Sequence, residues 1–287
     1  GDRVRSFARA DAHVHLFEGS YQGNSFTRRP GVLIDEVLCY QSLMQEYQIQ
    51  AALVIGFAGE SWCAENNGFL AELIPRCSWM QALAYWDLNS DRDPLEQLGE
   101  WRGQGFIGVS LYVFEKLEIQ GLAGIKDEVW NWLECNGWLI SVNSSGGRWS
   151  LWKPILEKHP RLRLAASHLG LPSKFSRTPS RDEAFKMMSP LNELYEFPEV
   201  HVKLSGYYAL TDPAHDFPHE AAWPVTEVIL KHFGSERLLW GSDFSPCLDF
   251  LSFPQTYGLF SKMPFFNEED REKILGGNLL RLIGGEA

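Results

Sequence analysis

Two histidines that lie two residues apart are the first residues of this sequence that could do chemistry. In "RADAHVHLFEG", residues 9–19, His13 and His15 close a short apolar run. Side chains alternate between the faces of a β-strand, so a strand here would put Asp11, His13 and His15 on one face and Ala12 and Val14 on the other. Such a pair can bind a metal ion, transfer protons or merely end a strand. The segment alone leaves these three interpretations open.

Two further polar residues close apolar runs elsewhere in the chain. "LRLAASHLG" carries His168, and "RLLWGSDFS" carries Asp243. Taken singly, a histidine at a strand end can simply hydrogen-bond a loop, and an aspartate there can cap the next helix. If all three runs are strands of one barrel, however, their carboxyl ends meet at one rim, which is where such barrels place their active sites. The sequence therefore indicates a candidate catalytic group of His13, His15, His168 and Asp243.

The segments that must position this group alternate along the chain. Eight short apolar runs predict strands, at residues 6–16, 50–57, 78–86, 106–114, 137–144, 162–170, 200–208 and 237–245. Amphipathic segments between them predict helices, at residues 35–48, 93–103, 126–136, 152–160, 181–197 and 219–234. Parallel strands need such crossover connections, and eight units close naturally into a (βα)8 TIM barrel. We expect a single barrel domain over residues 1–287.

An open, doubly wound sheet is the competing fold. It usually has a glycine-rich phosphate-binding turn after its first strand, whereas this chain continues as "HVHLFEGSYQG". "SGGR", residues 145–148, lacks the Gly-Lys-Ser/Thr ending of a phosphate loop and is interpreted as an ordinary loop. The closed barrel is therefore the predicted fold.

Composition and charge narrow the range of partners. The net charge is −11, and no basic block is dense enough to follow a phosphate backbone, so we expect no nucleic acid. A small-molecule substrate is expected, and an anionic one is compatible because local groups set the field of a pocket. No apolar run reaches the ~18 residues of a membrane span, so we expect a cytoplasmic protein that does not enter membranes. The chain has no C-x-x-C pair, which predicts reduced core thiols at Cys39, Cys63, Cys77, Cys135 and Cys247.

Five short motifs, in order along nearly the whole chain, carry a family resemblance. "DAHVH", "SHLGLP", "VHVKLSG", "WGSDFSP" and "ILGGNLLRL" resemble the amidohydrolase superfamily, and more narrowly its lactonase branch related to 2-pyrone-4,6-dicarboxylate lactonase and the sugar-acid lactonases. The resemblance implies a (βα)8 barrel and hydrolysis of a small lactone. By match of motif, it gives catalytic roles to His13, His15, His168 and Asp243.

One position departs from the pattern of the metal-dependent members of this superfamily. They usually have a histidine at the end of the fifth strand, where "GWLISVNSSGG" offers Asn143. If a metal is bound, His13, His15 and Asp243 could still provide the three protein ligands of a catalytic zinc ion. Because an amide is a much poorer donor than imidazole for zinc, the sequence favours an enzyme that requires no metal, with divalent zinc as the alternative.

Hydrolysis of a lactone needs a base for the water and a group that stabilises the carbonyl oxygen as it becomes an oxyanion. Asp243 is the predicted base, and the three histidines would surround the carbonyl as hydrogen-bond donors or imidazolium ions. Arg28 and Arg29, in the loop after the first strand, are interpreted as solvated charges that could instead reach over the barrel mouth. Substrate contacts are expected from Asn143, Lys203, Tyr112 and Tyr207.

Other functions fit the same residues. The enzyme alternatives are a metal-dependent amide or ester hydrolase, a decarboxylase and a sugar-lactone isomerase. A barrel that binds a ligand without catalysis is the alternative from another class, since a fold never guarantees a function. Substrate identity, stereochemistry and oligomeric state stay open at this point.

Overall fold

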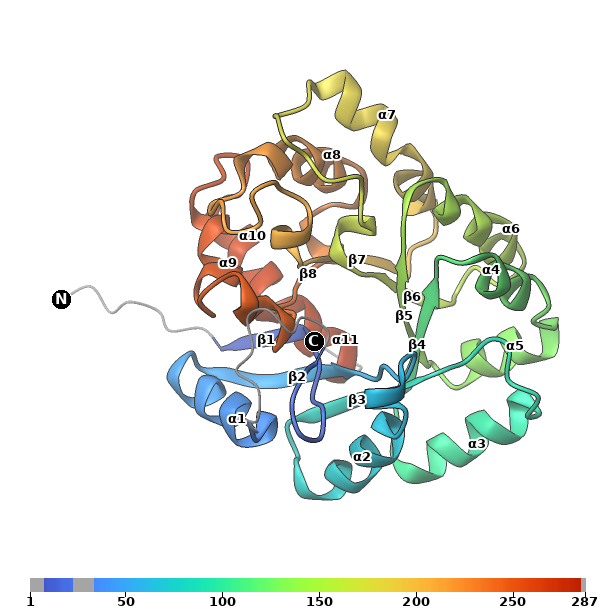
Figure 1. Ribbon diagram of the computed structural model, residues 1–287. Helices are drawn as coiled ribbons and strands as arrows, with labels where there is room; N and C mark the ends of the chain where they lie inside the picture. The colour runs from blue at the N-terminus through green and yellow to red at the C-terminus, as the bar shows by residue number, and fades with distance from the viewer. Residues whose placement is uncertain (1–7, 23–33, 285–287) are drawn as a thin grey trace.

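The computed structural model describes residues 8–22 and 34–284. Its eight strands form one parallel sheet in sequential order, and a bridge between Val14 and Phe244 joins the first strand to the segment that follows the last one (Figure 1). The predicted (βα)8 barrel is confirmed, and all eight predicted strands are present. Their bounds are β1 Arg9–Val14, β2 Ile49–Ile55, β3 Met80–Tyr85, β4 Gly108–Val113, β5 Leu139–Ser144, β6 Arg163–Ala166, β7 Val200–Leu204 and β8 Leu238–Trp240.

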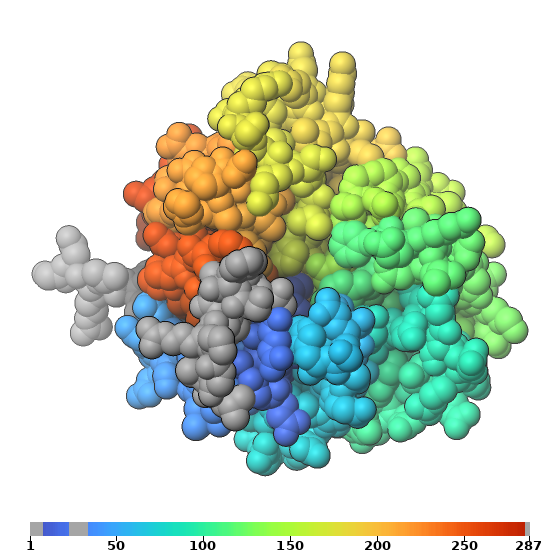
Figure 2. Space-filling model, viewed as in Figure 1, coloured from blue at the N-terminus to red at the C-terminus, as the bar shows by residue number. Residues whose placement is uncertain are grey.

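Helices surround the strands on the outside of the ring (Figure 1), and in the space-filling view the colours follow one another around the molecule in chain order (Figure 2). Each predicted helix corresponds to an observed one: α1 Glu36–Glu46, α3 Pro94–Gln104, α5 Asp127–Cys135, α6 Trp152–Lys158, α7 Arg181–Asn192 and α8 Trp223–Phe233. Five further helices were not predicted: α2 Asn66–Leu73, α4 Lys116–Ala123, α9 Gln255–Gly258, α10 Glu268–Glu272 and α11 Asn278–Gly284. None of the five exceeds eight residues, so each gives only one or two turns of the periodic pattern, a weak signal even though the equally short α6 was predicted.

Capping residues fix the ends of the longer helices. Ser180 and Glu183 form a capping box at the start of α7, in which each side chain accepts a hydrogen bond from the other residue's backbone N–H. Pro94 occupies the first turn of α3, and Gly105 ends that helix with φ +98°, in the left-handed region that glycine adopts without strain.

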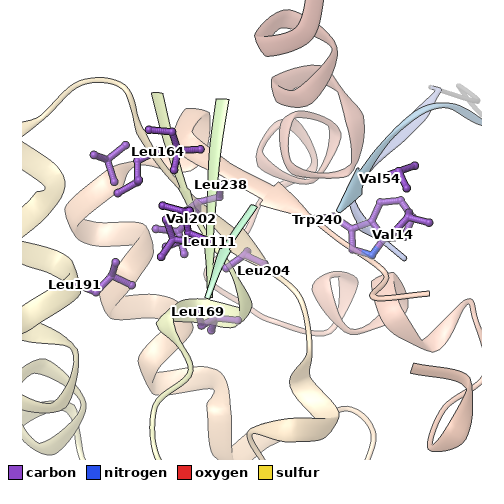
Figure 3. Close-up of a cluster of buried hydrophobic side chains, with 14 of the residues drawn as sticks. Val14, Val54, Leu111, Leu164, Leu169, Leu191, Val202, Leu204, Leu238 and Trp240 are labelled. Carbon is purple, nitrogen blue, oxygen red and sulfur yellow. The ribbon is translucent and has the colours of Figure 1, made fainter. Parts of the chain in front are cut away.

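Two apolar layers hold the barrel together. The larger one lies between the sheet and the helices and includes Val14, Val54 and Trp240 (Figure 3). The smaller one lies inside the ring and is built mainly of alanines and aliphatic residues of the strands, such as Ala10, Ala12 and Leu53. Leu279 and Leu282 of α11 join this inner layer, so α11 closes the barrel at the amino ends of its strands.

The prediction that Asp11 shares a face with His13 and His15 is wrong. Between Asp11 and Val14 the register of β1 against β2 shifts, so that β1 advances by one residue more than its partner. Such a bulge reverses the alternation of side chains. The Asp11 carboxylate accepts hydrogen bonds from the Tyr40 hydroxyl of α1, at 2.9 Å, and from the backbone N–H of Ser242, at 2.8 Å. Asp11 therefore ties β1 to α1 and to the segment after β8.

The cysteines form no disulfide among the described residues. Cys63, Cys77 and Cys247 are buried and Cys39 is partly buried, whereas Cys135 is exposed, so the prediction of a core position is wrong for Cys135. Within the described ranges, no helix is both long enough and apolar enough to cross a lipid bilayer.

Candidate active site

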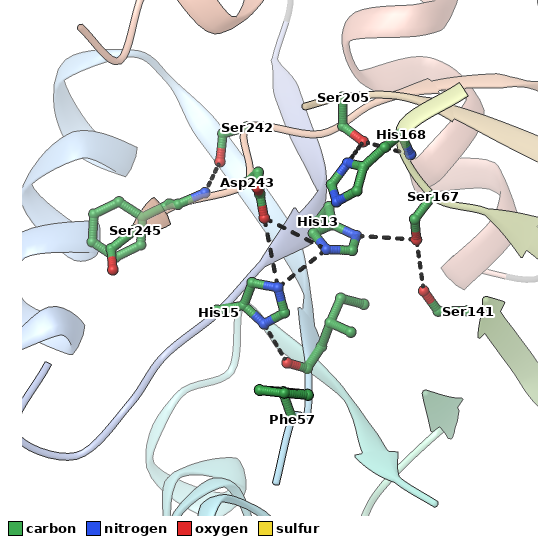
Figure 4. A network of polar contacts seen from close by, with 12 residues as sticks. His13, His15, Phe57, Ser141, Ser167, His168, Ser205, Ser242, Asp243 and Ser245 are labelled. Carbon is green, nitrogen blue, oxygen red and sulfur yellow. Dashed lines mark hydrogen bonds and ion pairs between the residues drawn. The ribbon is translucent and has the colours of Figure 1, made fainter. Parts of the chain in front are cut away.

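Three of the four predicted residues converge at the carboxyl ends of the strands. The Nε2 atoms of His13 and His15 lie 3.2 Å apart, and Oδ1 of Asp243 lies 3.6 Å from the first and 3.5 Å from the second (Figure 4). The His15 ring is oriented by its Nδ1–H, which donates to the carbonyl oxygen of Ile55 at 2.9 Å. Segments from opposite ends of the chain thus form one compact polar group.

His168, the fourth predicted residue, packs beside this group. Its ring centroid lies 4.7 Å from that of His13. Ser205 Oγ accepts a hydrogen bond from the His168 backbone N–H at 3.1 Å and contacts Nδ1 of the same residue at 2.8 Å. A Cβ atom at Gly206 would lie 2.5 Å from that Nδ1, so only glycine fits behind the ring. Ser205 and Gly206, in the "LSG" at the end of β7, therefore hold the His168 ring in position.

Lys203 lies beneath the histidines and is fully buried. Its ammonium nitrogen lies 3.0 Å from Nδ1 of His13 and 2.7 Å from Oγ of Ser141. The hydroxyl oxygen of Ser167 lies 3.5 Å from each of these two atoms. A lysine enclosed in this way cannot reach a substrate carboxylate as the sequence suggested. It instead contacts the side of the His13 ring that faces away from Asp243.

Burial shifts the pKa values of these residues in the direction that favours their uncharged forms. It lowers the pKa of His15 to about 4, that of His168 to about 3, and that of His13 well below its usual value, with the Lys203 charge adding to each effect. The three rings are therefore neutral near pH 7, which favours hydrogen-bond donors over imidazolium ions. Burial also lowers the pKa of Lys203 to about 7, although the Asp11 and Asp243 carboxylates oppose this.

Asp243 is a buried carboxyl group with a strongly raised pKa. Burial raises this pKa to about 7, while a hydrogen bond from the Tyr208 hydroxyl and the Lys203 charge oppose the rise. The Tyr208 hydroxyl donates to Oδ2, which leaves Oδ1 turned toward the two histidines. Asp243 has φ +60° and His168 has φ +55°, so both occupy the left-handed region that non-glycine residues rarely adopt and that is common at functional sites.

Tyr208 replaces Tyr207 as the tyrosine of this site. The Tyr207 hydroxyl lies 2.9 Å from Oγ1 of Thr226 on α8, in the layer between sheet and helices, so Tyr207 is not available to a substrate. Two adjacent tyrosines look alike in a sequence, and no local pattern distinguishes them. Gly206, with φ +65°, ends the regular alternation just before them.

Asn143 and Tyr112 lie on paired positions of β5 and β4. Asn143 is two residues after Ser141 and so lies on the same face of β5, toward the barrel interior. Its Nδ2 is buried and finds no hydrogen-bond partner among the described residues, which is unusual for an amide. The Tyr112 ring packs between those of Phe57 and Tyr85, with centroids at 4.8 and 5.8 Å. Arg28 and Arg29 lie outside the described residues.

The donor atoms of His13, His15 and Asp243 fit a divalent cation. All three lie within 4.8 Å of one another, and their separations of 3.2, 3.5 and 3.6 Å match the ligand-to-ligand distances around a tetrahedral ion with bonds of about 2.0–2.2 Å. Asn143 adds no fourth ligand of comparable strength.

Fold and site together define a (βα)8-barrel enzyme whose polar centre lies at the carboxyl ends of its strands. The chain belongs to the amidohydrolase family, whose sequence profile matches residues 10–285. The expected family is thereby confirmed.

Curated relatives with similar sequences are lactonases. The L-fucono-1,5-lactonase of Burkholderia ambifaria is 30% identical over 127 residues, which cover 42% of this chain and 41% of the relative. The enzyme of the same name from Burkholderia multivorans is 23% identical over 226 residues, 76% of each chain. The first alignment thus spans less than half of the relative's length, and the second about three quarters.

Solved structures share the fold at lower identity. An amidohydrolase from Burkholderia multivorans, crystallised with bound zinc, is 20% identical with a TM-score of 0.77, over 97% of this chain and 99% of that one. A protein from Pseudomonas putida assigned as a 2-pyrone-4,6-dicarboxylic acid hydrolase is 19% identical with a TM-score of 0.72, over 98% of each chain.

Proposed function

We propose that this protein hydrolyses a small lactone derived from a sugar acid or from an aromatic-degradation intermediate. The observation that carries the proposal is the position of Asp243, a buried carboxylate that faces the neutral imidazole rings of His13 and His15 and has a pKa raised to about 7. A general base is most effective when its pKa lies near the working pH. The names of the curated relatives support the lactone as the substrate class.

In the proposed reaction, Asp243 Oδ1 takes a proton from a water molecule as the water oxygen attacks the lactone carbonyl carbon. A tetrahedral intermediate forms, and its collapse breaks the bond between that carbon and the ring oxygen. The protonated carboxyl of Asp243 then returns the proton to the departing ring oxygen, which becomes the hydroxyl of the product. Water and lactone are consumed to give one hydroxy acid, and Asp243 regains its starting form.

Two uncharged donors are available for the developing oxyanion. The Ser205 hydroxyl accepts from the His168 backbone N–H and can donate its own proton to Nδ1, in which case the ring proton is on Nε2 and is available to a substrate. Asn143 Nδ2 is a second donor, since it has no partner among the described residues. Preorganised donors of this kind are worth about 10²–10³-fold each in rate.

His13, His15 and Asp243 are the residues that would hold a metal ion, and a zinc ion there would polarise the carbonyl or acidify a bound water. We propose that the reaction does not require it. While Lys203 is protonated, its ammonium has donors only, so Nδ1 of His13 accepts from it and the proton of the neutral His13 ring is on Nε2. In that state the His13 Nε2–H donates to His15 Nε2 at 3.2 Å, which accepts because the His15 ring proton is on Nδ1, and this pairing competes with the binding of a cation.

The proposal is tested with a panel of sugar-acid and aromatic-derived lactones. A pH indicator measures the rate of proton release on each lactone, before and after the enzyme is treated with a chelator. We expect proton release on at least one lactone and the same rate after chelation. The mass of the product distinguishes the three reactions. Hydrolysis adds the mass of one water, decarboxylation removes that of carbon dioxide, and isomerisation leaves the mass unchanged. Failure of every lactone would refute the substrate class, and loss of rate on chelation with recovery on added zinc would refute the metal-independent reaction.

A further inference from the structure

A cavity lies at the opposite end of the barrel from His13 and Asp243. Its volume is about 840 Å³, within the range of small-molecule sites. The chain segments that enter β6, β7 and β8 form its walls together with α11. Four arginines line it, which are Arg161, Arg163, Arg237 and Arg281.

The positive charge of this cavity exceeds the negative charge around it. None of the four guanidinium groups forms an ion pair within the described part of the chain. Two glutamates also line the cavity, but Glu236 already pairs with Lys273 at 3.4 Å, which leaves Glu199 against four positive charges. In a chain with a net charge of −11, this is a local reversal of sign. A surface so arranged attracts anions.

Two of the arginines are held rigidly. Arg163 donates to the carbonyl oxygens of Gly137 and Leu282, and Arg237 donates from Nε to Phe233 and from Nη1 to Phe197, both at 3.0 Å. Because backbone atoms fix these groups, their charges are preorganised and cost little further ordering on binding.

The other two arginines are available to a ligand. Arg161 makes no side-chain hydrogen bond to a described residue, and Arg281 makes one, to Asn278 within its own helix. Both side chains belong to exposed residues at the cavity wall. They can therefore turn toward an anion without breaking a contact between elements.

Acceptors beside the arginines indicate that the ligand also carries hydroxyl groups. His201 is only 8% exposed, and its Nδ1–H donates to the Glu199 carbonyl oxygen at 3.1 Å. Nε2 of this neutral ring is then an acceptor, and it has no partner among the described residues. The Glu199 carboxylate is a second acceptor in the same wall.

We propose that this cavity binds a small hydroxylated metabolite that carries a phosphate group or several carboxylates. The arginines take the anionic groups, for which the guanidinium fork is well matched, and His201 and Glu199 take the hydroxyls. The site is separate from the catalytic group, and the proposal does not depend on the reaction performed there.

Isothermal titration with glucose 6-phosphate and with citrate tests the site, and inorganic phosphate serves as the small-anion comparison. We expect saturable binding of at least one of the two hydroxylated anions. The Arg161→Gln, Arg281→Gln double variant should bind at least tenfold more weakly, because each charge-assisted contact is worth about tenfold or more. Phosphate-bearing and carboxylate-bearing ligands are distinguished by which titrant binds.

Two control variants test whether the anion binds in this cavity. The Arg177→Gln, Arg181→Gln double variant removes the same charge from exposed positions next to and on α7 and should bind as the parent does. Asp243→Asn, which alters the catalytic group, should also leave the binding constant unchanged. Equally weakened binding in both arginine double variants would show a general charge effect. Weaker binding in Asp243→Asn would place the anion in the catalytic site. The absence of saturable binding up to ~10 mM would exclude a useful affinity. Any of these results would overturn the proposal.

Discussion

Asp243 concentrates most of the proposed chemistry in one side chain. We expect Asp243→Asn to lower kcat by about 10²–10⁴-fold with little change in the melting temperature, because asparagine keeps the shape and removes the basicity. Steady-state kinetics and thermal unfolding of the purified variant measure both quantities. A folded variant with near-parental kcat would mean that Asp243 only caps the segment after β8 and that one of the histidines is the base.

Tyr208 should set the pH at which Asp243 becomes active. Its hydroxyl stabilises the charged carboxylate and so holds the pKa of Asp243 below the value that burial alone would give. A base works only when deprotonated, so activity should rise as the pH passes upward through about 7. In Tyr208→Phe this pKa rises and the acid limb of kcat/KM moves to higher pH, so that the variant loses more activity at about pH 6 than at about pH 9.

The neighbouring tyrosine provides a matched control for this pH profile. Tyr207→Phe removes the same hydroxyl from a side chain that contacts Thr226 rather than Asp243. It should cost about 1 kcal/mol of stability and leave the acid limb in place. A shift of the limb in Tyr207→Phe, or none in Tyr208→Phe, would contradict the assignment of Tyr208.

At the scale of elements, irregular backbone places the functional groups. The bulge of β1 turns Asp11 toward α1 and leaves His13 facing Lys203 in the barrel interior. The turn after β7 brings Gly206 against His168. β1 and the turn after β7 therefore contribute through their departure from regular geometry near the carboxyl ends of the strands, which is where loops of this fold carry function.

Gly206→Ala tests the turn after β7. The added Cβ would meet His168 Nδ1 at 2.5 Å, so the ring must leave its present position beside His13 and Ser205. We expect a loss of kcat of about tenfold or more, because small displacements of positioned groups are costly to catalysis. Gly137→Ala is the control: its φ of +59° imposes similar backbone strain, but its Cβ would meet only Arg163 Nη1, at 3.9 Å. Both variants should lose stability, and only Gly206→Ala should lose kcat per folded molecule.

On the scale of the whole molecule, one end of the barrel carries the catalytic group and the other end stabilises the fold. The carboxyl ends of the strands hold the polar group, whereas α11 seals the amino ends with Leu279, which is 1% exposed. We expect Leu279→Ala to lower the free energy of unfolding by about 2–5 kcal/mol through lost burial and the cavity it leaves. The enzyme that remains folded should keep its kcat, as measured at a temperature below the transition.

An exposed leucine serves as the reference for that measurement. Leu117 on α4 is 65% exposed, so Leu117→Ala should change stability by no more than about 0.5 kcal/mol. If Leu279→Ala were equally mild, α11 would not be an essential part of the inner layer.

The sequence by itself determined the barrel and the membership of its central group. Eight apolar runs separated by helical segments admit few arrangements other than a closed parallel sheet, because parallel strands require crossovers of fixed hand. Once the strands are known, their carboxyl ends must meet, so His13, His15, His168 and Asp243 could be grouped by type and position alone. Local periodicity and chain order carry this information.

Only the tertiary structure decided the direction of individual side chains. The bulge that separates Asp11 from His13, the choice of Tyr208 over Tyr207, and the burial of Lys203 beneath His13 all depend on contacts with segments far away in the chain. The raised pKa of Asp243 and the gathering of four arginines around α11 have the same origin. Side chains alternate regularly along a strand, and a single extra residue or a positive φ interrupts this alternation. Such interruptions are stabilised by neighbouring residues that only the folded chain brings together.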